Sequence, residues 1–342
     1  MKKMLAILLA LVTVFSVTTV FAEDIIQTNF TAPELPADLD DSSNKVVIYS
    51  GAEEYRNEYF MKRLTEQFPD YEIVIEYMPT GNLAAKLAAE GTDTDIDIIY
   101  DLDYSYAGLV EEYLCDLSDY DQSIYTDDVI APSGKYMAEC RNGGAIIINP
   151  DVLAEKGLAE PTCYADLIKP EYKGLISMPS PKSSGTGYMF VKNLVNTWGE
   201  DEAFDYFDAL AENILQFTSS GSGPVNALVQ NEVAIGLGMT AQAVTKINEG
   251  ANLKILFFEE GSPFSLYGYA MPEGKQNRKA VREVFNFFYT NLDPEDKQLF
   301  YPEKIYKEYD FEIENYPTNI TYGDMSNNTT EEKTRLLENW EY

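Results

Sequence analysis

The order of apolar and polar positions predicts alternating strands and helices over the first third of the chain. Short apolar runs, typical of buried strands, are each followed by a stretch whose apolar residues recur every three or four positions, as in an amphipathic helix. The predicted strands are 46–49, 71–77 and 96–100, and the predicted helices are 53–68, 83–89 and 106–113. This order is typical of a mostly parallel sheet with helices on both faces.

A second αβ unit follows. An apolar strand over 145–150 is long enough to leave the first unit, and further strands are expected at 175–178, 216–218 and 233–238 with helices between them. The chain then returns through apolar residues 266–272, and the pattern over 278–342 favours helices joined by loops. The sequence therefore predicts two similar α/β halves.

The amino terminus has the pattern of a secretory signal. Lys2 and Lys3 give a positive start, an apolar run follows, and Ala22 supplies a small residue at the expected cleavage point. An uncleaved membrane anchor is the alternative, but an apolar core of about sixteen residues is short of the roughly twenty that span a bilayer. We expect a signal peptide over 1–22, a polar leader over 23–44, and export to the periplasm or the outer face of the cytoplasmic membrane.

Composition narrows the function. The 342 residues carry 25 basic and 57 acidic side chains, a net charge of −32, which disfavours a nucleic-acid surface. There is no histidine, so Ser-His-Asp and Cys-His catalysis and His-ligated zinc are excluded. The three cysteines, Cys115, Cys140 and Cys163, match no metal motif and allow at most one disulfide. We expect a binding protein without metal or cofactor rather than an enzyme, with an exported carboxylate-dependent hydrolase as the alternative.

Four turns rich in small and hydroxyl residues stand between a predicted strand and a predicted helix. They are Ser50-Gly51, Thr80-Gly81, 183–188 and 219–223. Small residues let a ligand approach the free N–H groups of a helix start, and hydroxyls add donors. One such turn would be only a helix cap. Four of them favour a ligand cleft, because ligands of open α/β sheets bind at the carboxyl ends of the strands.

Other side chains near these turns are candidates too. Tyr104 and Tyr267 could cover a ligand, and Asp101 could bind a cationic one. Arg141 could neutralise an anion, although an exposed salt bridge is the ordinary role of such an arginine. The full set of candidate ligand-binding residues is Ser50, Gly51, Thr80, Gly81, Asp101, Tyr104, Arg141, Ser183, Ser184, Gly185, Thr186, Ser220, Thr240 and Tyr267.

Several of these segments, in this order, resemble a known family. The segments 46–51, 80–83, 144–149, 181–188 and 232–238 are similar to those of extracellular solute-binding proteins of bacterial ABC importers. The similarity is to the type II periplasmic binding proteins that include ferric-iron, phosphonate, thiamine and polyamine receptors. The resemblance implies a two-lobed clamshell with crossovers near 145–149 and 258–269. Its parts would be lobe 1 (45–143 plus 259–290), lobe 2 (144–258) and a C-terminal helical segment (291–342).

The resemblance also implies a function. The protein would capture a small polar, anionic solute such as a phosphonate or phosphate ester by hinge closure and deliver it to an ABC importer permease, acting as a monomer without nucleic acid. A ferric-iron or polyamine-type cation receptor of the same fold is the alternative. Ferric members carry adjacent tyrosines after the strand that matches 233–238, where this chain has Met239-Thr240-Ala241-Gln242.

Overall fold

The computed structural model describes residues 25–342, so the predicted signal peptide lies outside the described residues. The described strands form one sheet in the order β2-β1-β3-β9-β4-β7-β5-β6, with β8 paired to β4. Their bounds are β1 Lys45–Ser50, β2 Glu72–Tyr77, β3 Ile98–Asp103, β4 Met137–Ile148, β5 Ile176–Pro179, β6 Ile214–Thr218, β7 Ile235–Met239, β8 Lys254–Leu256 and β9 Phe264–Ala270.

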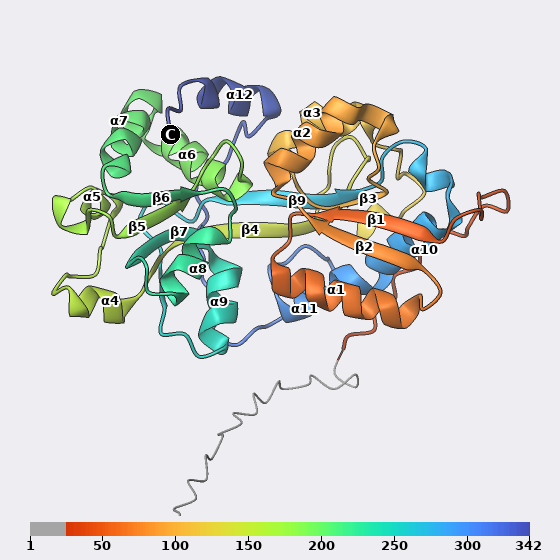
Figure 1. Cartoon of the computed structure of the whole chain (residues 1–342), viewed down its shortest axis with the longest axis horizontal. Helices are drawn as coiled ribbons and strands as arrows, with labels where there is room; N and C mark the ends of the chain where they lie inside the picture. Colours follow the sequence, from red (N-terminus) through yellow and green to blue (C-terminus); the bar gives the residue numbers. More distant parts are fainter. Residues whose placement is uncertain (1–24) are drawn as a thin grey trace, which may run out of the picture.

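Two antiparallel strands, β4 and β9, run from one half of the molecule to the other (Figure 1). Strand β4 pairs with β9 as far as Gly143 and with β7 from Gly144 onward. On one side lie the parallel strands β2, β1 and β3, which we call lobe 1 together with their helices. On the other side lie the parallel strands β7, β5 and β6, which with β8 and their helices form lobe 2.

Helices cover both faces of the sheet in each lobe (Figure 1). Lobe 1 contains α1 (Glu54–Gln67), α2 (Thr80–Glu90), α3 (Ala107–Val110), α10 (Lys279–Phe287) and α11 (Asp293–Leu299). Lobe 2 contains α4 (Pro150–Glu155), α5 (Tyr164–Leu167), α6 (Gly185–Trp198), α7 (Glu200–Ala211), α8 (Gly223–Val229) and α9 (Thr240–Asn248). The helix predicted over 106–113 is only the short α3, flanked by 3-10 turns.

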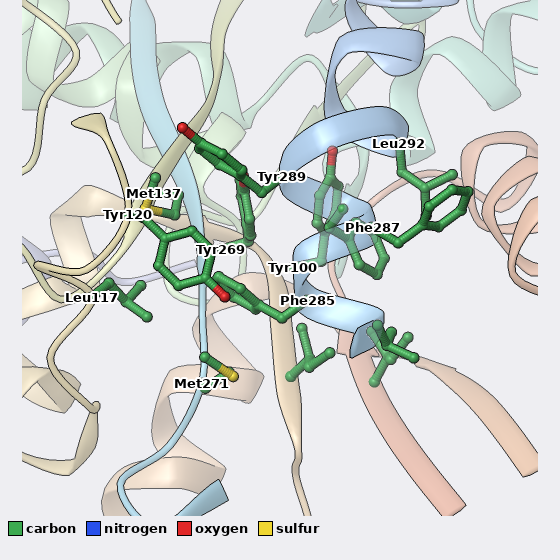
Figure 2. Close-up of a cluster of buried hydrophobic side chains, with 14 of the residues drawn as sticks. Tyr100, Leu117, Tyr120, Met137, Tyr269, Met271, Phe285, Phe287, Tyr289 and Leu292 are labelled. Atoms are coloured by element: carbon green, nitrogen blue, oxygen red, sulfur yellow. The ribbon is translucent and has the colours of Figure 1, made fainter. Parts of the chain in front are cut away.

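Each lobe has its own apolar core. In lobe 1, side chains from β3, β9 and α10 meet in a cluster rich in aromatic rings, among them Tyr100, Tyr269 and Phe285 (Figure 2). The lobe 2 core is built on β5, β7 and α6, and it also includes Leu336 and Trp340 from the end of the chain. The two lobes are therefore separate packing units joined through one sheet.

The C-terminal segment differs from the helical one that we expected over 291–342. Beyond α11, the described residues contain one more α-helix, α12 (Thr330–Glu338), and residues 300–329 form no helix. This segment packs Tyr306 into the lobe 1 core, pairs Tyr322 with Ser262 beside β9, and ends on lobe 2. The resemblance led us to expect two crossovers between the lobes, and the C-terminal segment adds a third connection.

All three cysteines are free, with Cys115 and Cys140 buried and Cys163 half-buried. No helix among residues 25–342 combines the length and the apolar character needed to cross a membrane.

Candidate ligand cleft

A cavity lies between the two lobes at the carboxyl ends of their strands. It is small, about 30 Å³, enough for about two water molecules. Its lining residues are Gly51, Glu53, Tyr77, Pro79, Thr80, Asp101, Asn142, Ser184, Gly185, Thr186, Gly221, Ser222, Met239, Tyr267 and Tyr301. Residues of both lobes and of both long strands therefore share this one space, which is the usual place for a ligand of an open α/β sheet.

Four helices of nine or more residues begin at this cavity. Glu53 precedes α1, Thr80 opens α2, Gly185 opens α6, and Met239 precedes α9. The first N–H groups of a helix have no partner inside it, and the helix dipole gives that end a partial positive charge. Among the described residues no lysine or arginine lines the cavity, and each of these helix starts adds a partial positive charge to it.

The lobe 2 side of the cavity is a surface of hydroxyl and backbone donors. Ser184 caps α6 by accepting a hydrogen bond from the N–H of Gly187, 3.4 Å away. Gly221 packs so closely against the hydroxyl of Thr186 that a β-carbon there would overlap it. This close approach, which needs glycine, brings Ser222 beside the first turn of α6. The result is a set of donors suited to an anionic or strongly polar group.

The lobe 1 side carries two carboxyl groups, those of Glu53 and Asp101. Arg56 on α1 lies beneath both, with its Nη1 3.2 Å from Glu53 and 3.6 Å from Asp101. Tyr301 donates a hydrogen bond to the second oxygen of Glu53 at 2.8 Å. Burial, reinforced by Glu139, raises the pKa of Asp101 well above its ordinary value despite Arg56. An ionised carboxyl group accepts hydrogen bonds from hydroxyls or binds a cation, and a protonated one can also donate a hydrogen bond.

Below this side of the cavity is a buried ionic cluster. Arg56 also contacts Glu139 at 2.5 Å and Asp296 at 2.7 Å. Lys297 contacts Asp296 at 2.7 Å, Glu139 at 3.3 Å and Asp293 at 3.9 Å. The three carboxyl groups around Lys297 lie close enough together to hold a metal ion, but the ammonium group already contacts all three.

An outer groove of about 890 Å³ opens beside the cavity. Glu53, Tyr77 and Ser222 line both spaces, so the groove leads into the cavity. Its walls are α1 on lobe 1 and α8 and α9 on lobe 2, and they include Glu54, Glu58, Gln242, Lys246 and Glu249.

The structure brings half of the sequence-predicted residues to the cavity. These are Gly51, Thr80, Asp101, Ser184, Gly185, Thr186 and Tyr267, while Ser220 lines the outer groove. Ser50 is buried behind the turn, where its hydroxyl accepts a hydrogen bond from Ala52. Thr240 is buried at the start of α9, and its hydroxyl has no partner among the described residues.

Four predicted residues have other contacts. The side chain of Tyr104 turns to Val129, whose carbonyl accepts its hydroxyl at 2.8 Å. Arg141 pairs with Asp128 and stacks on Phe264 and Tyr322, so its guanidinium does not line the cavity. The Ser183 hydroxyl donates to the carbonyl of Ser219. Gly81 packs against the Ser183 carbonyl and the Tyr106 hydroxyl, where lobe 1 meets lobe 2.

Sequence reasoning missed several lining residues. Glu53 and Ser222 lie within or next to predicted turns, so their positions could have been found by extending each turn by one or two residues. Tyr77 ends a predicted strand, so extending the following turn, Thr80-Gly81, toward the amino terminus would also have come close to it. Nothing in the sequence pattern points to Tyr301, which reaches the cavity from the segment after α11.

The comparisons with known proteins agree with this architecture. The profile of the family described as bacterial extracellular solute-binding protein matches residues 104–292. An uncharacterized Haemophilus influenzae protein is 27% identical over 251 residues, covering 69% of this chain and 70% of its own length. The spermidine/putrescine-binding periplasmic protein of Escherichia coli is 27% identical over 149 residues, 42% of this chain and 41% of that protein.

A solved structure has the same fold. The periplasmic binding protein AfuA from Actinobacillus pleuropneumoniae, with exogenous fructose-6-phosphate bound, superimposes with a TM-score of 0.76 at 24% identity, covering 86% of this chain and 97% of AfuA. The predicted fold class, an α/β two-lobed type II clamshell, is thus confirmed. The family match spans more than half of the sequence, and the chain therefore belongs to the bacterial extracellular solute-binding proteins.

Proposed function

We propose that this protein is the exported substrate-binding component of an ABC importer and captures a small polyhydroxylated solute that carries a phosphate or phosphonate group. Solute-binding proteins of this family bind small molecules and work with a membrane permease. The cleft between the lobes, at which four helices begin, is the observation that carries the proposal.

The two sides of the cavity suit the two ends of such a solute, which is larger than the space of about 30 Å³ and would bind with the lobes further apart than they are here. An anionic group fits the first turn of α6, where Ser184 and Thr186 add hydroxyl donors to the free N–H groups. Sugar-like hydroxyls fit Glu53 and Asp101 on lobe 1. AfuA, which shares the fold, has fructose-6-phosphate bound. The net charge of −32 opposes an anion only weakly at this site, because distant charges are screened beyond about 8 Å at physiological salt.

The carboxyl groups also favour a second candidate, a polyamine. Glu53 and Asp101 share the cavity with Tyr77, Tyr267 and Tyr301, and no basic side chain of residues 25–342 lines it. Carboxylates and aromatic rings attract ammonium groups. One of the relatives is a spermidine/putrescine-binding protein.

A ligand panel separates these candidates. The purified protein would be melted with fructose 6-phosphate, fructose, inorganic phosphate, putrescine, spermidine or ferric citrate, and each stabilising compound titrated by calorimetry. A ligand at a hundredfold excess over its Kd adds about 2.7 kcal/mol of stability. We expect a large shift with fructose 6-phosphate and little with fructose. A shift with polyamines alone would support the second candidate, and an unchanged melting temperature with every compound would contradict both.

Mass spectrometry of the recovered solute should show it unaltered, whereas conversion would favour a hydrolase.

A further inference from the structure

The last helix of the chain is anchored in lobe 2. Leu336 and Trp340 are buried in the lobe 2 core. Glu332 pairs with Lys192 of α6 at 3.3 Å, and Arg335 pairs with Glu200 of α7 at 2.8 Å. Helix α12 therefore sends its buried apolar side chains and its ion pairs to lobe 2, while its first turn lies against α3 of lobe 1 (Figure 1).

That first turn is hydrogen-bonded to lobe 1. The hydroxyl of Thr330 accepts a hydrogen bond from the N–H of Gly108 at 3.0 Å and donates one to the carbonyl of Ser105 at 3.1 Å. Lys333, one turn later, donates to the hydroxyl of Ser105 at 3.0 Å. These bonds tie α12 to the segment that follows β3.

Lys333 holds an unusual position between the lobes. It is 3% exposed, and among the described residues no carboxylate forms an ion pair with it. Its ammonium lies 3.3 Å from the ring centroid of Tyr106 in lobe 1 and 4.5 Å from that of Tyr188 in lobe 2. Burial lowers the pKa of Lys333 to about 7, with the charge of Asp103 opposing the shift, so this amino group depends on its ring and hydroxyl contacts rather than on an ion pair. Moving Tyr106 away from Tyr188 would remove some of them.

We propose that α12 is an interlobe latch, in which Thr330 and Lys333 hold lobe 1 to lobe 2. The latch favours, even without a solute, the arrangement described here, which we call closed because the lobes leave only about 30 Å³ between them. A hinge motion in β4 and β9 would separate the segment after β3 from α6 and α12. Opening then breaks the hydrogen bonds of Thr330 and Lys333 with lobe 1, while the anchors in lobe 2 stay intact. The latch sets how much of the ligand-free protein is closed, and with it the rate at which the cleft opens.

A matched pair of double variants tests this latch. Thr330→Val with Lys333→Met removes the contacts with lobe 1. The control, Thr334→Val with Glu331→Met, replaces a threonine and a charged residue at exposed positions of the same helix. The hydroxyl of Thr334 donates to the Thr330 carbonyl, within α12 itself. Cooperative urea unfolding would establish that each variant is folded, and Thr330→Val alone replaces the double variant if it is not.

The readout needs no solute. Spin labels on Glu58→Cys and Glu249→Cys, which face each other across the outer groove, would report the distance between lobes in a Cys163→Ser background. Small-angle scattering would report the radius of gyration. We expect longer distances between the labels in the latch variant, with a closed-to-open ratio reduced by about tenfold. The control should give the same distance distribution as the labelled protein without further substitutions. Identical distance distributions in latch variant and control would overturn the proposal. Because no solute is added, this outcome does not depend on the proposed function.

Discussion

Gly185, at the start of α6 in lobe 2, lies directly against the carboxyl group of Asp103 in lobe 1. A β-carbon added to Gly185 would overlap Oδ2 of Asp103 and lie 2.5 Å from the hydroxyl of Tyr267. Asp103 is fully buried, and this oxygen has no hydrogen-bond partner among the described residues. Its other oxygen is fixed by Ser105 and Ser265. The closed arrangement thus requires glycine at position 185.

Gly185→Ala should therefore hold the lobes apart. We expect a larger radius of gyration by small-angle scattering, and affinity for fructose 6-phosphate at least tenfold lower by calorimetric titration, because closure must then displace a fixed carboxyl group. The fold should be unaffected, since alanine is favourable in a helix. Adding Asp103→Ala to Gly185→Ala should restore part of the compactness. A Gly185→Ala protein as compact as the unsubstituted one would contradict this reading.

Thr186→Val tests the donors on the lobe 2 side. The change keeps the shape of the side chain and removes the hydroxyl from the cavity lining. A hydrogen bond to a charged group contributes about 1.5–3 kcal/mol, so affinity for fructose 6-phosphate should fall by roughly tenfold or more. Ser184→Ala should also cost about 1 kcal/mol of folding stability, because Ser184 caps α6. Unchanged affinity in Thr186→Val would remove this hydroxyl from the site.

Arg56→Met should be strongly destabilising. Arg56 is 1% exposed and contacts four carboxyl groups, and removing one partner of a buried ion pair costs about 3–5 kcal/mol. Urea unfolding at pH 7 measures the loss. Arg335→Met, at a half-exposed ion pair, serves as the control and should lose far less stability, because exposed ion pairs contribute little. Equal losses in the two variants would show that the buried cluster has no special role in stability.

The pH dependence of stability should carry the signature of Asp293. Its carboxyl group is fully buried, and burial raises its pKa from 3.8 to about 7, with Glu139 and Asp296 adding to the effect and Lys297 and Tyr306 opposing it. Between about pH 4 and pH 7 the folded protein keeps this proton while the unfolded chain releases it. The contribution of Asp293 to stability is therefore complete below pH 4 and decreases as the pH rises to 7.

Asp293→Asn removes this titration while retaining an amide that can bond to the hydroxyls of Tyr100 and Tyr306. Urea unfolding of both proteins at pH 5, 6, 7 and 8 should show the variant gaining stability relative to the original as the pH increases to 7. A constant difference across this range would mean that Asp293 does not titrate there.

The fold class could be predicted because the strands and helices have clear periodicities and end at glycine- and serine-rich turns. Those turns also located much of the cavity lining, such as Gly51 and Thr186, because a turn at the end of a parallel strand has only one edge of the sheet to occupy. Local pattern was sufficient for features that depend on local backbone geometry.

Features that depend on distant segments were missed. Arg56 reads as one more charged residue of an amphipathic helix, and only the packing of α11 against α1 shows that it is buried among carboxylates. Tyr301 is 248 residues from Glu53, to which it donates a hydrogen bond. Tyr104 and Arg141 were expected near a ligand from their sequence positions, but the contacts of their side chains are set by Val129 and Asp128.

The position of Leu336 and Trp340 in the lobe 2 core has a consequence for biogenesis. The final turn of the chain completes a core whose other members begin as early as Ile146. Lobe 2 can therefore reach its full stability only after residues as late as Trp340 have been synthesised and are free to pack. Truncation before Leu336 should therefore weaken this core, and lobe 2 stays incompletely packed until Leu336 and Trp340 have docked on it.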